Sequence, residues 1–242
     1  HLAFLTKDRA EAMDEEGYRQ GNLAIRQQLL AALDPIGVDR LFVASSGAVY
    51  RADDESASSA MRVYGKLKRD DERVFSAWAN DGDRCVVNAR VFSLSGAFIN
   101  KPETYALAAF ILDALSGRPV RIQATRPVYR SYVAVTELLS LVLTLLAEGQ
   151  PGARTFDSGG EPLEMGELAQ IVSREVGAPA VERSGYDPTL PPDRYVGDNR
   201  AYRSLLREAG LTMTPIERQV AETADFLARQ QVSWAPRLGG PR

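Results

Sequence analysis

A tyrosine and a lysine stand one helical turn apart in this 242-residue sequence, at positions 64 and 68 of the segment YGKLK. Residues i and i+4 of a helix share a face, so Tyr64 and Lys68 can point into the same cleft. A free tyrosine loses its proton near pH ~10, and a neighbouring ammonium group lowers this pKa by favouring the phenolate. The spacing therefore fits a general acid or base, although an exposed helix face bearing Lys66 and Lys68 would also produce it.

A possible hydroxyl partner for this pair lies fourteen residues earlier, in FVASSGAVY at 42–50. The apolar run 40–46 predicts a strand covered on both faces, and it ends in Ser45 and Ser46. Ligands of open α/β sheets bind at the carboxyl ends of strands, so a serine here could hold the substrate oxygen that exchanges a proton with Tyr64. The alternative is that these serines only cap the strand end.

Composition excludes several other kinds of chemistry. The net charge of −3 gives no reason to expect nucleic acid as a partner. With one cysteine, Cys85, and one histidine, His1, neither a disulfide framework nor a Cys/His metal site is expected, and a reducing cytoplasm is the natural setting. Proton chemistry is thus left to Tyr, Lys, Ser, Asp or Glu. The apolar stretch 134–149 is too short and interrupted for a membrane span and predicts a buried helix, and no signal peptide is visible.

The first half of the chain alternates helix and strand patterns. A helix at 17–33, the strand at 40–46, a helix through Tyr64 and Lys68 to about 80, and a strand at 85–92 predict an α/β fold with a parallel sheet. Farther along, we expect helices at 103–116, 134–149, 161–177 and about 199–230, strands at 120–124, 130–135 and 154–160, and a turn-rich segment at 178–194.

Six segments carry a family resemblance through their shared order: HLAFLT, FVASSGAVY, YGKLKRDDE, NARVFSLSG, RSYVAVTELLSLVL and TFDSGGEPLEMGELAQIV. Together they resemble the extended short-chain dehydrogenase/reductases, and most closely the sugar-nucleotide epimerase/dehydratase group. The resemblance implies an α/β fold with a Rossmann-like, doubly wound parallel sheet and a smaller α/β substrate-binding lobe. The dinucleotide-binding part would be 1–98 and 132–160, and the substrate-binding lobe 99–131 and 161–242.

The resemblance also implies roles for single residues. Tyr64 would be the acid/base, and Lys68 would lower its pKa and bind the nicotinamide ribose of NAD or NADP. Ser46 matches the catalytic Ser or Thr of the family, and Ser45 is the neighbouring alternative and a candidate cofactor contact. No metal is implied.

Further residues match substrate-binding positions of the family. Arg130 and Arg194 could bind a nucleotide diphosphate with their planar guanidinium groups, and Ser93 replaces an Asn that many relatives carry. For Arg194 a solvated loop position is an equal alternative. Asn22, on an otherwise apolar helix face, matches a family Asn and predicts a structural hydrogen-bonding residue near the site.

The sequence departs from the family in two ways. None of its nineteen glycines forms G-x-G-x-x-G or G-x-x-G-x-x-G, so the first strands of the family fold are expected to be missing from this chain. Hexose 4,6-dehydratases carry Asp-Glu directly after the catalytic Thr, whereas this chain has Gly47 and Ala48. Neither can move a proton, so the sequence disfavours a dehydratase.

The leading hypothesis is an NAD(P)-dependent epimerase or ketoreductase that acts on a nucleotide-linked sugar. The alternative is a catalytically silent relative that senses a dinucleotide or binds a partner. The resemblance implies a cytoplasmic homodimer with no membrane or nucleic-acid partner.

Overall fold

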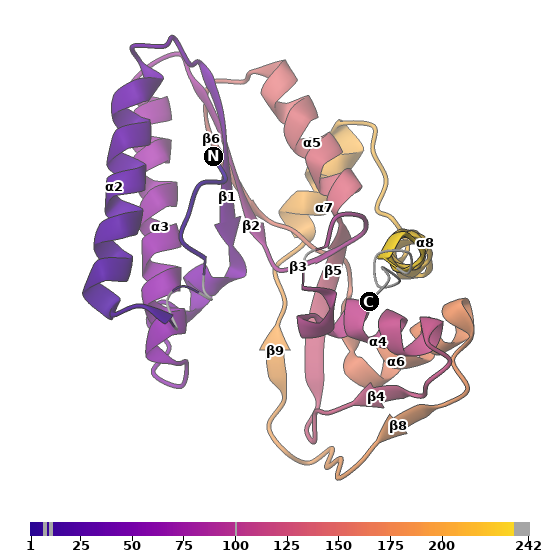
Figure 1. The fold of residues 1–242 in the computed structure, drawn as a ribbon. Coiled ribbons are helices and arrows are strands. Elements are labelled where there is room, and N and C mark those ends of the chain that lie inside the picture. Colours follow the sequence, from indigo (N-terminus) through magenta and orange to yellow (C-terminus); the bar gives the residue numbers. More distant parts are fainter. Residues whose placement is uncertain (7–8, 10–11, 100, 235–242) are drawn as a thin grey trace, which may run out of the picture. The chain divides into compact units, whose positions relative to one another are not determined.

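Helices and strands alternate along the chain, as its sequence pattern predicts (Figure 1). A computed structural model describes residues 1–6, 9, 12–99 and 101–234, and for 231–234 it describes the backbone alone. Its elements are α2 (Glu15–Leu33), β1 (Arg40–Ser46), α3 (Ser59–Asn80), β2 (Cys85–Val91), β3 (Ser93–Ser95), α4 (Ala106–Leu115), β4 (Val120–Ile122), β5 (Val128–Ala134), α5 (Val135–Glu148), β6 (Gly152–Asp157), β7 (Pro162–Glu164), α6 (Met165–Val172), β8 (Val181–Arg183), β9 (Asp193–Tyr195), α7 (Arg200–Glu208) and α8 (Ile216–Trp234). The predicted α/β class with parallel strands is confirmed.

The chain divides into two units, each built from separate stretches. The first unit comprises 1–92, 139–158 and 197–211, and the second comprises 93–138, 159–196 and 212–242. The boundary runs through helix α5. We describe each unit by itself.

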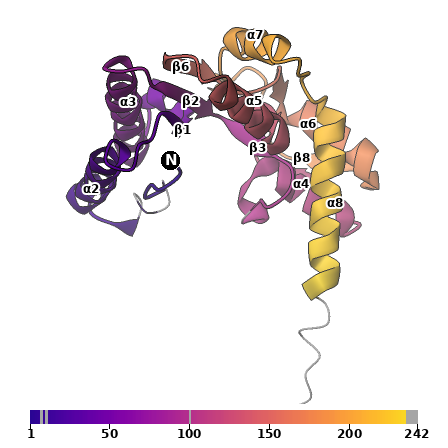
Figure 2. The ribbon, with the colours of Figure 1, turned by 90° about the horizontal axis from the view of Figure 1, so that it is seen from above.

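The first unit contains a parallel sheet in the order β1-β2-β6. Register pairs Arg40 with Cys85 and Ser46 with Val91, so the carboxyl ends of β1 and β2 lie level. Helix α3 packs on this sheet with α2 beside it (Figure 2). The core between them is formed by apolar side chains of the helices and strands: Leu33, Leu41, Val43, Phe75, Trp78, Ala79 and Val86.

Local sequence sets where these elements begin. Asp14 caps α2 by accepting the Gly17 N–H at 2.8 Å, and the Ser58 side chain accepts the Met61 N–H at the start of α3. Strand β1 ends at Ser46, which caps the 3₁₀ turn Gly47–Arg51. The turn carries the chain away from the sheet at the edge where Ser45 and Ser46 lie.

The second unit has two sheets, one of four strands and one of two. One follows the order β3-β5-β7, with β9 also paired to β5, and the other pairs β4 with β8. Its core is formed by helices α4, α6 and α8 against strands β4 and β5, through side chains that include Phe110, Ile111, Ile122, Leu168 and Val220.

Four predictions from the sequence differ from the structure. The helix expected at 161–177 begins only at Met165, because Pro162–Glu164 forms strand β7 by pairing with β5. The helical region expected at about 199–230 is two helices, because Gly210 adopts a φ of +68° that ends α7. The segment 178–194, expected to hold turns, contains β8 and β9, since short strands can form wherever a partner strand offers pairing. Strand β3 follows the predicted strand 85–92, where no strand was expected.

Candidate active site

Lys68 lies against the carboxyl end of β1. Its ammonium Nζ donates to the Ala44 carbonyl oxygen at 2.8 Å, and the residue is only 7% exposed. Burial lowers the pKa of Lys68 to about 8, while the carboxylates of Asp71 and Glu72 act in the opposite direction. The Lys68 ammonium therefore lies at the end of β1 that carries Ser45 and Ser46, here called the serine end, as the sequence pattern predicted.

Tyr64 and Lys68 share one neighbour, the ring of Phe4. The Lys68 Nζ lies 3.7 Å from the centroid of this ring, and the Tyr64 ring meets it edge-on at 5.7 Å and 80°. Phe4 thus contacts both members of the predicted acid/base pair. A cation over an aromatic face is stabilised by the ring quadrupole, so Phe4 partly offsets the burial of Lys68.

Residues 1–6 are held in place by α2. The Leu5 N–H donates to Asn22 Oδ1 at 2.8 Å, and the Tyr18 hydroxyl donates to the Leu5 carbonyl at 2.7 Å. Asn22 is 3% exposed and also donates through Nδ2 to the Tyr18 carbonyl at 3.1 Å. The hydrogen-bonding role predicted for Asn22 is confirmed, and its effect is to fix the segment that carries Phe4.

Ser46 lies where β1 turns into its 3₁₀ exit. Its Oγ accepts the Ala48 N–H at 3.2 Å and so caps the 3₁₀ turn. The next residue, Gly47, faces the ring of Phe92, and a Cβ built there would lie 2.7 Å from Phe92 Cζ. The serine turn is therefore covered closely by an aromatic side chain.

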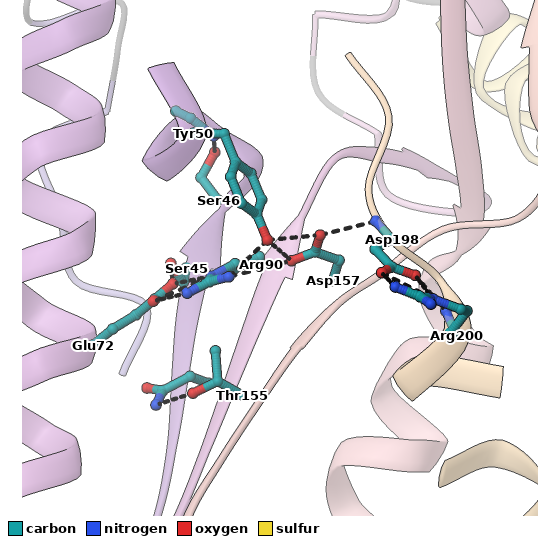
Figure 3. A network of polar contacts seen from close by, with 11 residues as sticks. Ser45, Ser46, Tyr50, Glu72, Arg90, Thr155, Asp157, Asp198 and Arg200 are labelled. Atoms are coloured by element: carbon teal, nitrogen blue, oxygen red, sulfur yellow. Dashed lines mark hydrogen bonds and ion pairs between the residues drawn. The ribbon is translucent and has the colours of Figure 1, made fainter. Parts of the chain in front are cut away.

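Ser45 points to a different partner. Its hydroxyl donates to the carboxylate of Glu72, on α3 (Figure 3). Glu72 in turn holds Arg90 of β2 through several hydrogen bonds, the shortest at 2.7 Å from Nη2 to Oε2. Glu72 raises the pKa of the Arg90 guanidinium further, which keeps it charged. Ser45 thus belongs to an ionic network inside the unit, and its contact with a cofactor stays a prediction.

The network continues to β6 through Tyr50. The Arg90 Nη1 donates to the Tyr50 hydroxyl at 2.8 Å, and that hydroxyl donates to the Asp157 carboxylate at 3.0 Å. Asp157 is 5% exposed and also accepts the backbone N–H of Asp198. Burial raises the pKa of Tyr50, and the nearby Asp157 charge adds to this effect. The carboxyl ends of all three strands are thus joined by polar contacts.

A shallow hollow of about 520 Å³ borders this network. It is lined by Tyr50, Arg90, Thr155, Phe156, Asp157, Asp198, Arg200 and Ala201.

The predicted substrate-binding residues lie in the second unit. Arg130 donates through Nη2 to Asp193 at 2.7 Å, and the Arg194 guanidinium lies over the Tyr129 ring at 4.4 Å. The two arginines stand on adjacent strands, because β5 pairs with β9. Ser93 begins β3, opposite Tyr132 of β5. Substrate contacts of these residues stay predictions.

The partners of Ser45 and Ser46 were not predicted from the sequence. Glu72 could have been noticed four residues after Lys68 on the same helix face, and Arg90 as a charge within an apolar strand. Asp157 and Tyr50 carried no comparable signal, because their partners are far away in the sequence. Phe4 carried no signal of its contact with Lys68 and Tyr64 in the sequence either.

Within the residues that the structure describes, no group of three or more His, Cys, Asp or Glu side chains is placed to hold a metal ion. None of the helices in that part of the chain is long and apolar enough to cross a membrane.

Comparison with known proteins decides the family. A model described as "NAD dependent epimerase/dehydratase family" matches residues 1–157, more than half of the chain. The chain belongs to this family. The resemblance inferred from the ordered segments is therefore confirmed.

Individual relatives of this family are distant. A probable UDP-glucuronate 4-epimerase from Rhizobium meliloti (strain 1021) is 22% identical over 207 residues, which cover 75% of this chain and 60% of that relative. A UDP-glucose 4-epimerase from Stenotrophomonas maltophila, solved with NAD and formylated UDP-arabinopyranose, matches with a TM-score of 0.76 at 22% identity, over 96% of this chain and 76% of that one. A UDP-N-acetylglucosamine 4-epimerase from Methanobrevibacter ruminantium M1, in complex with UDP-N-acetylmuramic acid, matches with a TM-score of 0.72 at 19% identity, over 95% and 76%. These solved structures share the Rossmann-like fold of this chain.

Proposed function

We propose that this chain is an NAD-dependent epimerase of a nucleotide-linked sugar, with Tyr64 as the acid/base. The observation that carries the proposal is the Lys68–Ala44 hydrogen bond, which ties the Tyr64–Lys68 helix to the serine end of β1. Family membership supports the proposal, and so do relatives named as 4-epimerases of UDP-sugars. The UDP-sugar class and C4 as the reacting carbon come from these names.

The residues at Lys68 fit the ribose of a nicotinamide cofactor. An ammonium group has three N–H donors, and the Ala44 carbonyl takes one of them. Lys68 can thus donate to a ribose hydroxyl while still bonded to β1. NAD, when bound, supplies a hydride acceptor for the sugar carbon. We assign no residue to the pyrophosphate, since the chain lacks a glycine-rich fingerprint.

The chain's own residues would handle the proton. Tyr64, as phenolate, takes the proton of the sugar hydroxyl, and the Lys68 ammonium favours that phenolate form. Ser46, at the carboxyl end of β1, would hold the same sugar oxygen through its hydroxyl group. Once the other face of the keto-sugar is reduced, Tyr64 returns the proton.

The packing of Phe92 against Gly47 argues against a dehydratase. A side chain at Gly47 would enter the space of the Phe92 ring, so the Asp that dehydratases carry there does not fit without moving Phe92. This supports an epimerase or a ketoreductase, which need only hydride transfer and one proton.

The two units suggest a division of roles, although their bounds differ from those expected, since 132–138 lies in the second unit and 197–211 in the first. We propose that the first unit binds the dinucleotide and the second binds the nucleotide sugar through Arg130 and Arg194. A homodimer is part of the same proposal, and light scattering of the purified chain would test it.

A substrate panel tests the function. The chain is incubated with NAD and UDP-glucose, UDP-glucuronic acid or UDP-N-acetylglucosamine, and products are identified by proton NMR. An epimerase forms the C4 epimer with no net NADH. A 4-keto-6-deoxy product would show a dehydratase, consumption of NADH by a keto-sugar would show a ketoreductase, and nucleotide binding without any turnover would show a silent relative.

A further inference from the structure

Gly65 stands in the interior of α3, directly after Tyr64, where glycine is costly. Glycine in a helix interior destabilises the helix by roughly 0.5–1 kcal/mol relative to alanine. The helix itself therefore offers no reason for Gly65. The reason lies in its contact with the 3₁₀ turn that follows β1. A Cβ built on Gly65 would overlap the carbonyl oxygen of Ala48 and lie 3.0 Å from its carbonyl carbon.

Ala48 connects Gly65 to the serine through the two peptide groups that flank its Cα. Its carbonyl group, in the peptide shared with Val49, faces Gly65. Its N–H, in the preceding peptide, donates to Ser46 Oγ at 3.2 Å, and Ala48 is 1% exposed. On the other side of this turn, Gly47 lies against the Phe92 ring. The segment Ser46–Ala48 is thus held between α3 and an aromatic ring, and both contacts require the absence of a side chain.

We infer that Gly65 is a positioning residue, which fixes the Ser46 hydroxyl relative to Tyr64 through Ala48. The inference rests on the proposed function, because that function gives Ser46 and Tyr64 their roles. The bare Cα of Gly65 lets α3 approach Ala48, and the Ala48 N–H then orients Ser46. Tyr64 is the adjacent residue of α3, so the contact fixes the serine turn against the part of the helix that carries Tyr64.

The methyl group that Gly65→Ala adds sets the expected size of the loss in kcat. Ordinary contact between carbon and oxygen needs about 3.0–3.5 Å, so Gly65→Ala must displace the Ala48 carbonyl by roughly 1 Å. A displacement of this size at reacting groups costs on the order of 10²-fold in rate. We expect the kcat of Gly65→Ala to fall by about 10- to 100-fold.

Amide hydrogen exchange tests the inference without any turnover. In Gly65→Ala, the Ala48 amide should exchange at least about tenfold faster than in the wild type, because its bond to Ser46 is disturbed. The Val87 amide, in the middle of β2, should be unchanged and thereby show that the fold is intact. The matched control is Gly82→Ala, in the turn after α3, where the added methyl meets only the flexible Arg84 side chain.

A double-mutant cycle with Ser46→Ala tests whether Gly65 affects kcat through the position of Ser46. If Gly65 acts by positioning Ser46, Gly65→Ala should lower kcat by less than about threefold in the Ser46→Ala background. Full additivity of the two losses, or an unchanged Ala48 exchange rate, overturns the inference. A wild type without turnover counts against the proposed function alone, because the exchange rate still decides the inference.

A second variant covers the case in which Gly65→Ala does not fold. Ala48→Gly loosens the backbone on both sides of this residue without adding an atom. It should speed amide exchange at position 48 and lower kcat several-fold, and the kcat loss should vanish in the Ser46→Ala background. Unchanged exchange at position 48 in this variant overturns the inference as well.

Discussion

The buried ammonium of Lys68 gives the stability of this protein a specific pH dependence. The pKa of Lys68 is about 8 in the folded chain, against 10.5 for an ordinary lysine. Because the folded state binds this proton more weakly, burial of Lys68 costs stability at low pH. The cost disappears as the pH rises from about 8 toward 10.5.

The size of the effect follows from the two pKa values. At pH 7 the cost is about 3 kcal/mol, and at pH 9 it is about 2 kcal/mol. Relative to a variant without this charge, the wild type should thus gain about 1 kcal/mol of unfolding free energy between pH 7 and pH 9. Lys68→Met provides the reference, since Met fills a similar volume and carries no titrating group.

Urea denaturation of both proteins at pH 7, 8 and 9 measures this difference directly. Cys85, whose pKa burial raises, contributes the opposite slope to both proteins and cancels when they are compared. Lys66→Met is the matched control on the same helix, and its pH dependence should run parallel to that of the wild type. If the stability difference between the wild type and Lys68→Met stays constant from pH 7 to pH 9, Lys68 is not held as a buried ammonium and the reasoning is wrong.

Three further substitutions test the surroundings of the site. Gly47→Asp should lower the unfolding free energy by about 1–3 kcal/mol, because the new side chain must displace Phe92, and unchanged thermal stability would refute that packing. Glu72→Gln removes the closer of the two carboxylates that pair with Arg90, leaving Asp157 at 3.6 Å, and should cost about 2 kcal/mol in urea denaturation, whereas a loss below about 0.5 kcal/mol would show that the pair adds little. Asn22→Ala removes two buried hydrogen bonds and should cost about 1–3 kcal/mol, and equal stability of variant and wild type would count against these bonds.

The chemistry of the serine end was predictable where it depended on local pattern. The apolar run 40–46 predicted β1 with its bounds, because a strand buried on both faces is apolar throughout. The spacing of Tyr64 and Lys68 predicted their shared helix face, since helical geometry alone sets it. These features needed no knowledge of distant residues.

The other features of the site and the fold depended on contacts between residues that are distant in the sequence. Tyr50 and Asp157 are 107 positions apart, and only the parallel pairing of the sheet places the carboxyl ends of β1 and β6 on the same side of it. Strands β8 and β9 are three residues each and exist through their pairing with β4 and β5, so the local sequence showed only turns. By contrast, the end of α7 was predictable from the sequence. Glycine is common directly after a helix C-terminus because it adopts positive φ easily, and Gly210 occupies that position.

The most direct test of the proposed function is the substitution Tyr64→Phe, which removes one oxygen atom. The variant should bind NAD and the UDP-sugar found in the substrate panel with unchanged affinity in calorimetry, since the aromatic ring and its contact with Phe4 are kept. Its kcat should fall by roughly 10²- to 10⁴-fold, the contribution typical of a general acid or base. A kcat equal to that of the wild type would contradict the assignment of Tyr64 as the acid/base.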